Sequence, residues 1–295
     1  MKRRTFTKLT GLSAIALSTT GFIKFNGESY VGDCETTTDI LGPFYRPNSP
    51  VRDNLVVKGM PGDLVELSGV VRHKDCTTPY KNAKIELWHC SAEEVYDNES
   101  EDYLYRGTTH CDKNGKYSFQ TQMPVPYDVG DGTIRPAHFH MMVSAPGYQS
   151  LVTQIYFTGD PYLEKDASSS SEEAKRRIIE VNKEDDMLKV VFDCNMNDRL
   201  KVSYNSLAQI TGKYKNDKTG KIRELFEKDG LLWLQNKVFG ESFDYVGDNE
   251  FVYPGMTEGS YRTLRFDLNQ KDVTKFILRT SWERGKETVA SFTKV

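Results

Sequence analysis

Short apolar runs with alternating polar positions recur along the chain from Leu64 to about residue 198. Turn residues bound these runs, as in Asp112-Lys113-Asn114-Gly115. Alternation with a period of two is typical of strands that bury one face, and frequent turns favour an antiparallel β-sandwich. We therefore expect an all-β fold here, with Val190-Val191-Phe192-Asp193 as its last strand. Residues 166–186 interrupt the pattern, and Glu172–Asn182 predicts a short polar helix beginning at a serine cap.

Residues 203–295 form a second region with the same pattern of strands and turns. This region contains neither histidine nor cysteine, so we do not expect a second metal centre in it. The pattern predicts a small antiparallel β-meander or barrel-like domain. The expected strands are Leu207–Tyr214, Ile222–Phe226, Leu231–Gln235, Phe251–Tyr253, Tyr261–Phe266, Val273–Ser281 and Thr288–Phe292.

The N-terminus carries Lys2-Arg3-Arg4-Thr5-Phe6-Thr7-Lys8-Leu9, followed by a mostly apolar stretch up to Ile23. This order of features resembles a twin-arginine export signal. We therefore expect residues 1–30 to be signal and linker, residues 31–198 to be the β-sandwich, and residues 203–295 to be the additional domain. The expected location is the periplasm or the extracellular space.

The net charge and the cysteines limit which binding partners and which cellular compartment we expect. The chain has 295 residues and a formal net charge of −3, with its Lys and Arg residues scattered, so nucleic-acid binding is not expected. No apolar run reaches the ~20 residues of a membrane-spanning helix, so we expect no stable membrane span after export. Disulfides are permitted in an oxidising compartment, but the sequence assigns no pairing and leaves oligomeric assembly open. The five cysteines all lie in the sandwich region: Cys34, Cys76, Cys90, Cys111 and Cys194.

The segment Arg135-Pro136-Ala137-His138-Phe139-His140 is the main candidate for chemistry. Two histidines two residues apart project from the same face of a β-strand and form half of a metal site. Tyr96 and Tyr127 could complete such a site as phenolates. A free phenol titrates near ~10, so only a strongly charged ion such as iron(III) holds it deprotonated. The alternative is a pair of buried histidines held by hydrogen bonds.

A series of motifs in this order resembles the intradiol ring-cleaving dioxygenases, which open catechols between their two hydroxyls. The similarity covers roughly residues 34–198. Tyr96 follows the strand residue Trp88 by eight positions, as the first tyrosine ligand of that family does. The other matching blocks are Gly42-Pro43-Phe44-Tyr45, Pro124-Val125-Pro126-Tyr127, Arg135 to His140, Thr153-Gln154-Ile155-Tyr156-Phe157 and Gly159-Asp160-Pro161-Tyr162-Leu163.

This resemblance implies a transthyretin-like β-sandwich that binds iron(III) through Tyr96, Tyr127, His138 and His140. It implies oxidative cleavage of a small aromatic diol with O2 to a muconate-type dicarboxylate. Tyr127 would also act as a general base, Arg135 would stabilise developing negative charge, and Gln154 would belong to the catalytic pocket. Substrate choice is left open, because the stretch from Tyr127 to Arg135 is short for the family.

Three alternatives remain open at this point. Tyr103 and Tyr105 lie close to Tyr96 in the sequence and compete with it for the ligand position, although the spacing from Trp88 favours Tyr96. The same scaffold could serve as a non-catalytic exported binding module without iron. A zinc hydrolase built on His138 and His140 would need a further histidine or carboxylate ligand that the sequence does not identify.

Overall fold

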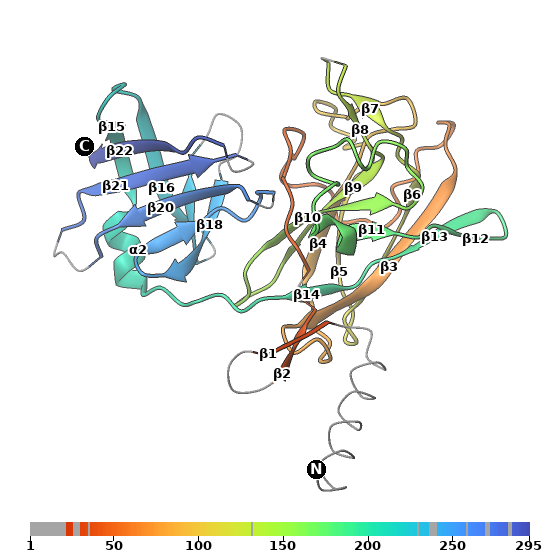
Figure 1. Cartoon of the computed structure of the whole chain (residues 1–295), viewed down its shortest axis with the longest axis horizontal. Coiled ribbons are helices and arrows are strands. Elements are labelled where there is room, and N and C mark those ends of the chain that lie inside the picture. The colour runs from red at the N-terminus through yellow and green to blue at the C-terminus, as the bar shows by residue number, and fades with distance from the viewer. Residues whose placement is uncertain are drawn as a thin grey trace, which may run out of the picture.

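A computed structural model describes residues 22–25, 30–34, 36–130, 132–228, 230–235, 241–257, 259–268, 272–282 and 285–295. Figure 1 shows a β-sandwich beside a β-barrel, so the predicted all-β class is confirmed. The apolar N-terminal stretch lies almost wholly outside the described residues. Within them, no helix is long and apolar enough to cross a membrane. Two short strands, β1 (Phe22–Phe25) and β2 (Tyr30–Asp33), pair across the predicted boundary between the linker, which ends at residue 30, and the sandwich.

The sandwich consists of two sheets of five strands. The first sheet, which we call the β9 sheet, has the order β11-β10-β9-β4-β5. The second has the order β12-β13-β3-β14, with β6 paired to β3. Most pairs are antiparallel, but β11 runs parallel to β10, and both β13 and β14 run parallel to β3. The bounds are β3 (Leu64–His73), β4 (Lys84–Trp88), β5 (Arg106–His110), β6 (Lys116–Gln122), β9 (His138–Ser144), β10 (Leu151–Phe157), β11 (Ile178–Ile179), β12 (Asn182–Glu184), β13 (Met187–Val191) and β14 (Cys194–Met196).

The hydrophobic core lies between the two sheets. Phe139 and Ile155 of the β9 sheet and Leu67 and Phe119 of the other sheet are all 0% exposed. Burying each such side chain contributes about 1.5–3 kcal/mol. Because neighbouring residues of a strand face opposite sides, His138 and His140 of β9 lie on the outer face of the β9 sheet.

The segment 36–46, which we call the crossing segment, lies over this outer face. Its backbone follows β10: Asp39 N donates to Val152 O at 2.9 Å, and Thr153 Oγ1 donates to Thr37 O at 3.0 Å. The crossing segment explains why every residue of β10 is buried although the sheet lies at one side of the sandwich. The outer face of the β9 sheet is therefore a second interior, and polar side chains occupy it.

The C-terminal region is a closed antiparallel barrel in which β15 pairs with both β16 and β22. Its interior is filled by apolar side chains, among them Tyr214, Phe243 and Phe276. The strands are β15 (Gly212–Asn216), β16 (Ile222–Lys228), β17 (Leu231–Leu234), β18 (Glu241–Gly247), β19 (Glu250–Val252), β20 (Tyr261–Phe266), β21 (Lys275–Ser281) and β22 (Thr288–Lys294). The strand β18 was not predicted from the sequence.

Two further predictions about local structure were wrong in the last third of the chain. Instead of a strand beginning at Leu207, the structure has the helix α2 (Tyr204–Ile210), because the Ser203 hydroxyl caps it by accepting from Ser206 N at 3.0 Å. Leu207 and Ile210 lie three residues apart on this helix and bury against the barrel core. The segment Val190–Asp193 is also not the last strand of the sandwich, because β14 follows it, within the predicted bounds of 31–198, and pairs with β3.

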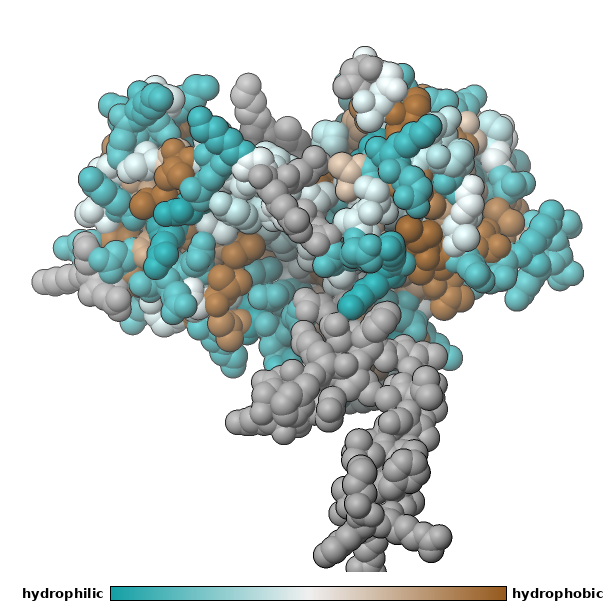
Figure 2. All heavy atoms as spheres, viewed as in Figure 1, coloured by the Kyte–Doolittle hydropathy of each residue, from teal (hydrophilic) through white to brown (hydrophobic). Residues whose placement is uncertain are grey.

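The predicted helix over 172–182 is reduced to a single 3-10 turn, η1 (Ala174–Arg177), after which the chain becomes extended. Ser171 does accept a hydrogen bond from Ala174 N at 3.1 Å, as the serine cap requires. Ile178 then pairs with Tyr156 of β10, so sheet pairing ends the helix after one turn. The hairpin of β12 and β13 that follows projects from the sandwich and has a hydrophilic surface (Figure 2).

The barrel contacts the sandwich near the crossing segment. Asp244 of β18 accepts from Ser150 N at 3.2 Å, and Thr38 Oγ1 donates to Met256 O at 3.4 Å. Tyr253 packs against the buried cluster that contains Leu41 and Trp88. The barrel therefore supports the crossing segment from outside.

One disulfide joins Cys34, just before the crossing segment, to Cys76, in the turn after β3. The other three cysteines, Cys90, Cys111 and Cys194, are buried free thiols. The disulfide closes a loop over a sequence separation of 42 residues. It therefore ties the beginning of the crossing segment to the second sheet.

We expect reduction of this disulfide to lower the free energy of unfolding by about 2–4 kcal/mol, because the unfolded chain regains the freedom that the bond removes. Urea denaturation with and without dithiothreitol measures the change. A Cys34→Ser/Cys76→Ser variant is the matched control and should not respond to the reductant. Equal stability of the oxidised and reduced protein would contradict the assignment.

Candidate metal centre

The strand β9 brings His138 and His140 together on the outer face of the β9 sheet, where each is 1% exposed. The Nδ1 atom of His138 lies 2.6 Å from Pro136 O. A carbonyl only accepts, so Nδ1 carries the proton and Nε2 presents a lone pair. This Nε2 lies 3.1 Å from Nε2 of His140. Two nitrogen donors about 3 Å apart match two ligands that each lie about 2 Å from a shared metal ion.

The two predicted tyrosines complete this cluster. Tyr96 lies in the loop after β4, and its hydroxyl is 3.4 Å from Nε2 of His138. Tyr127 lies on β7 (Tyr127–Asp128), with its ring centroid 5.5 Å from that of Tyr96 and 5.7 Å from that of His138. The ring of Phe44, from the crossing segment, stacks on Tyr96 at 4.3 Å. Four side chains from three separate segments of the sequence therefore converge on one buried point.

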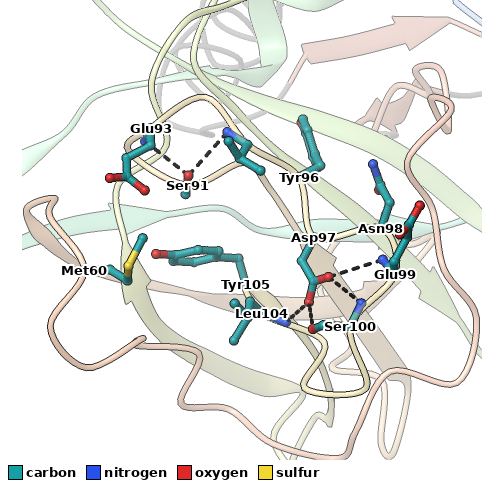
Figure 3. A pocket seen from close by; sticks show the side chains of 11 residues that line it. Met60, Ser91, Glu93, Tyr96, Asp97, Asn98, Glu99, Ser100, Leu104 and Tyr105 are labelled. Carbon is teal, nitrogen blue, oxygen red and sulfur yellow. Dashed lines mark hydrogen bonds between the residues drawn. The ribbon is translucent and has the colours of Figure 1, made fainter.

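Tyr103 and Tyr105 are not part of this cluster. The Tyr103 hydroxyl lies 3.4 Å from Pro47 O. The ring of Tyr105 points into a cavity of about 530 Å³, whereas the ring of Tyr96 points away from it (Figure 3). Among the three tyrosines, Tyr96 alone is in contact with His138, as the spacing from Trp88 indicates.

His140 is held by packing on both sides. The indole of Trp88 stacks on its imidazole at 5.1 Å, with the two rings only 4° from parallel. On the crossing segment, a Cβ at Gly42 would lie 3.0 Å from Cε1 of His140, and the φ of +75° at Gly42 also disfavours any other residue. The Nδ1 atom of His140 has no hydrogen-bond partner in the described part of the chain. The ring orientation therefore depends on Trp88 and Gly42.

Burial keeps all four side chains neutral in the absence of a metal ion. It lowers the pKa of His138 to about 3, and, together with the neighbouring His138, it lowers the pKa of His140 well below its usual value. Burial raises the pKa of the Tyr96 phenol well above 10 and raises that of Tyr127, although Arg135 opposes the latter shift. Neutral imidazoles are ready to coordinate, whereas the phenols need a strongly charged ion to lose their protons.

The donor set excludes an ordinary zinc site. Within the described residues, no three or more His, Cys, Asp or Glu side chains gather in a way that could hold a metal ion. A metal ion held here by four protein ligands would use the two tyrosines with His138 and His140. Two phenolates and two imidazoles suit a hard trivalent ion and are not the set that zinc selects.

Arg135 lies beside the cluster on β8 (Ile134–Arg135), directly opposite Tyr127. Its Nε pairs with Asp166 Oδ1 at 2.6 Å, and its Nη2 donates to Gln154 Oε1 at 2.8 Å. Gln154 lies opposite His140 in the β9 sheet and donates from Nε2 to Ile40 O at 2.9 Å. Both ends of the Gln154 amide are thus engaged by the protein, which places it against Arg135 and the crossing segment.

Four residues near Arg135 were missed by the sequence analysis: Asp39, Tyr156, Asp166 and Arg177. Tyr156 could have been found, because it lies two residues after Gln154 and so shares its strand face. Asp166 and Arg177 carry no such signal, since they lie in an irregular segment and in η1.

The lowered histidine pKa values predict that neither site imidazole gains a proton between pH 8 and pH 5. A base whose folded pKa is depressed stays neutral until the pH falls to that value, which is about 3 for His138. Nitrogen chemical shifts of the metal-free protein, followed by NMR, measure the protonation state. A histidine peptide is the reference and should titrate near ~6.5. A titration step of either site histidine near that value would contradict the burial described above.

Comparison with known proteins agrees with this geometry. A family model described as "Dioxygenase" matches residues 40–205, more than half of the chain. Catechol 1,2-dioxygenase of Candida albicans is 37% identical over 155 residues, which cover 45% of this chain and 50% of that protein. Chlorocatechol 1,2-dioxygenase of Rhodococcus opacus is 32% identical over 173 residues, covering 51% and 66%. The chain thus spans only half to two thirds of these relatives.

Among solved structures, chlorocatechol 1,2-dioxygenase from Pseudomonas putida superposes with a TM-score of 0.50 and 26% identity, over 55% of this chain and 72% of that one. The matched family region, residues 40–205, contains β3 to β14 and all four residues of the cluster. The chain therefore belongs to the intradiol ring-cleavage dioxygenase family.

Proposed function

We propose that this protein is an iron(III) intradiol dioxygenase that cleaves a catechol-type aromatic between its two hydroxyls, using O2. The observation that carries this proposal is the convergence of Tyr96, Tyr127, His138 and His140 on one buried point. The relatives named catechol and chlorocatechol 1,2-dioxygenases support the class of substrate. We assign the reaction to the β-sandwich and assign no catalytic role to the barrel.

The four clustered residues would hold the iron ion. Bound there, iron(III) would supply the Lewis acidity that activates a chelated catecholate toward O2. Tyr127 would accept a proton from one substrate hydroxyl at its phenolate oxygen, as a general base. This role suits a tyrosine whose neighbour Arg135 favours the charged form.

Arg135 would stabilise the negative charge that develops on the substrate. Its side chain is 11% exposed, Nε forms an ion pair with Asp166, and Nη2 donates to Gln154 and Tyr156. We assign the remaining N–H groups, those on Nη1, to a substrate oxygen. A fixed donor in a dry site stabilises developing charge without having to reorganise.

The competing function is a non-catalytic binding module on the same scaffold. It would require no iron, and the two tyrosines would serve only as packing. The Nε2 lone pair of His138, which faces His140 and Tyr96 because Nδ1 is bonded to Pro136 O, favours the metal-binding role.

The test is the iron content and the visible spectrum of the purified protein. We expect about one iron per chain and a tyrosinate-to-iron absorption band that shifts when catechol is added anaerobically. His140→Ala and Tyr127→Phe should lose most of the iron, the band and turnover, because each removes a ligand. His110→Ala, which alters an exposed histidine at the end of β5, is the matched control. Retention of iron and colour in Tyr127→Phe would show that the ligand set is wrong.

We further propose that the protein is exported through a twin-arginine route. The Lys2-Arg3-Arg4 sequence and the Cys34–Cys76 disulfide support this location, because disulfides persist in oxidising compartments. After expression in a bacterium that has this route, we expect the protein in the periplasmic fraction. The variant Arg3→Lys/Arg4→Lys should remain in the cytoplasm. Equal distribution of both proteins would refute the proposal.

A further inference from the structure

A buried polar network surrounds Tyr156, which is 0% exposed on the outer face of β10. Its hydroxyl lies 2.9 Å from Asp39 Oδ2, 3.0 Å from Gln154 Oε1 and 3.2 Å from Arg135 Nη2. The phenol thus connects the crossing segment, which carries Asp39, to Arg135 beside the four-residue cluster. The proposed reaction assigns no role to this phenol.

The carboxylate of Asp39 is paired with Arg177 from η1, and both side chains are at most 2% exposed. Arg177 also donates from Nε to Thr37 Oγ1 at 3.0 Å and from Nη1 to Gln154 O at 3.0 Å. A buried ion pair of this kind persists only when its remaining donors and acceptors are satisfied, as they are here. The pair therefore fixes Asp39 with respect to β10.

The charges determine the direction of the Tyr156 hydrogen bond. A hydroxyl has one proton, and the Asp39 carboxylate is a stronger acceptor than the Gln154 amide oxygen. The proton therefore goes to Asp39, and the oxygen lone pairs of Tyr156 face Arg135 and accept from its Nη2. Gln154 Oε1 accepts from the same Nη2 at 2.8 Å.

Arg135 is consequently restrained at two positions of its guanidinium. Nε forms an ion pair with Asp166 without a hydrogen bond, whereas Nη2 donates to Tyr156 and Gln154. Because the guanidinium is rigid and planar, restraining Nε and Nη2 also restrains the direction of Nη1. Loss of the Tyr156 hydroxyl would leave Nη2 with the Gln154 contact alone.

We propose that Tyr156, oriented by the Asp39–Arg177 ion pair, is a positioning residue that sets the donor geometry of Arg135 during ring cleavage. This inference rests on the proposed function. It gives the crossing segment a second role. The segment then covers the four-residue cluster and also determines the orientation of Arg135.

The decisive experiment is a double-mutant cycle between Tyr156→Phe and Arg135→Gln. We expect Tyr156→Phe to lower kcat by about tenfold with little change in KM, whereas direct loss of a transition-state donor lowers it by ~100–1,000-fold. Iron content and the tyrosinate band should stay unchanged. In the Arg135→Gln background, Tyr156→Phe should have no further effect, because it acts only through Arg135.

Tyr117→Phe is the matched control, because it removes another buried phenol hydroxyl, which donates to Phe192 O at 2.6 Å in the sandwich core. It should leave kcat unchanged. Asp39→Asn should reproduce the effect of Tyr156→Phe where it folds. Full kcat in Tyr156→Phe, or an equal loss in both arginine backgrounds, would overturn the proposal.

A second measurement separates this proposal from the proposed function. In the metal-free protein, the Arg135 Nε proton should exchange with solvent faster in Tyr156→Phe than in the wild type or in Tyr117→Phe, whether or not the protein turns over catechols. Unchanged exchange would overturn the positioning role. Absence of iron and turnover in the wild type, together with faster exchange in Tyr156→Phe, would overturn only the enzymatic proposal.

Discussion

The alternation of β9 is the constraint on which the rest of the site depends. Phe139 enters the core between the sheets, so His138 and His140 must lie on the outer face. The two Nε2 atoms lie 3.1 Å apart, and burial keeps both imidazoles neutral, because a charged imidazole is disfavoured away from water. The outer face of the sheet must therefore be covered, although it carries histidine, glutamine and tyrosine beside apolar residues such as Trp88 and Val152.

The crossing segment meets this requirement and thereby becomes part of the site. Gly42 leaves room for the His140 ring, Phe44 stacks on Tyr96, and Asp39 extends the polar network to Arg135 through Tyr156. The segment is held at its beginning by the disulfide at Cys34, along β10 by hydrogen bonds, and from outside by Tyr253 of the barrel. The barrel has a filled interior, so its contact with this segment is the feature that links it to the chemistry.

The sequence predicted what depends on local spacing. The two histidines fell on one strand face because the period of a strand is two, and the resemblance to a family supplied Tyr96 and Tyr127, which no local pattern connects. The helix α2 was mistaken for a strand because Leu207 and Ile210 fit a short apolar run, and the Ser203 cap that decides for a helix was not considered. The ion pair of Asp39 and Arg177 joins residues 138 positions apart. No local pattern in a single sequence predicts such a contact.

These long-range ion pairs also change how the role of Gln154 is interpreted. Gln154 matches a pocket glutamine by sequence, but its amide contacts Ile40, Tyr156 and Arg135, so its hydrogen bonds serve the protein. The neutral amide of Gln154 lies between two ion pairs, Asp39–Arg177 and Arg135–Asp166. It separates the two arginines from each other and adds no charge of its own. An acid at this position would place a second carboxylate beside Arg135, which Asp166 already pairs, and would weaken the arginine further as a donor to developing negative charge. The uncharged glutamine therefore positions the arginine without adding negative charge beside it.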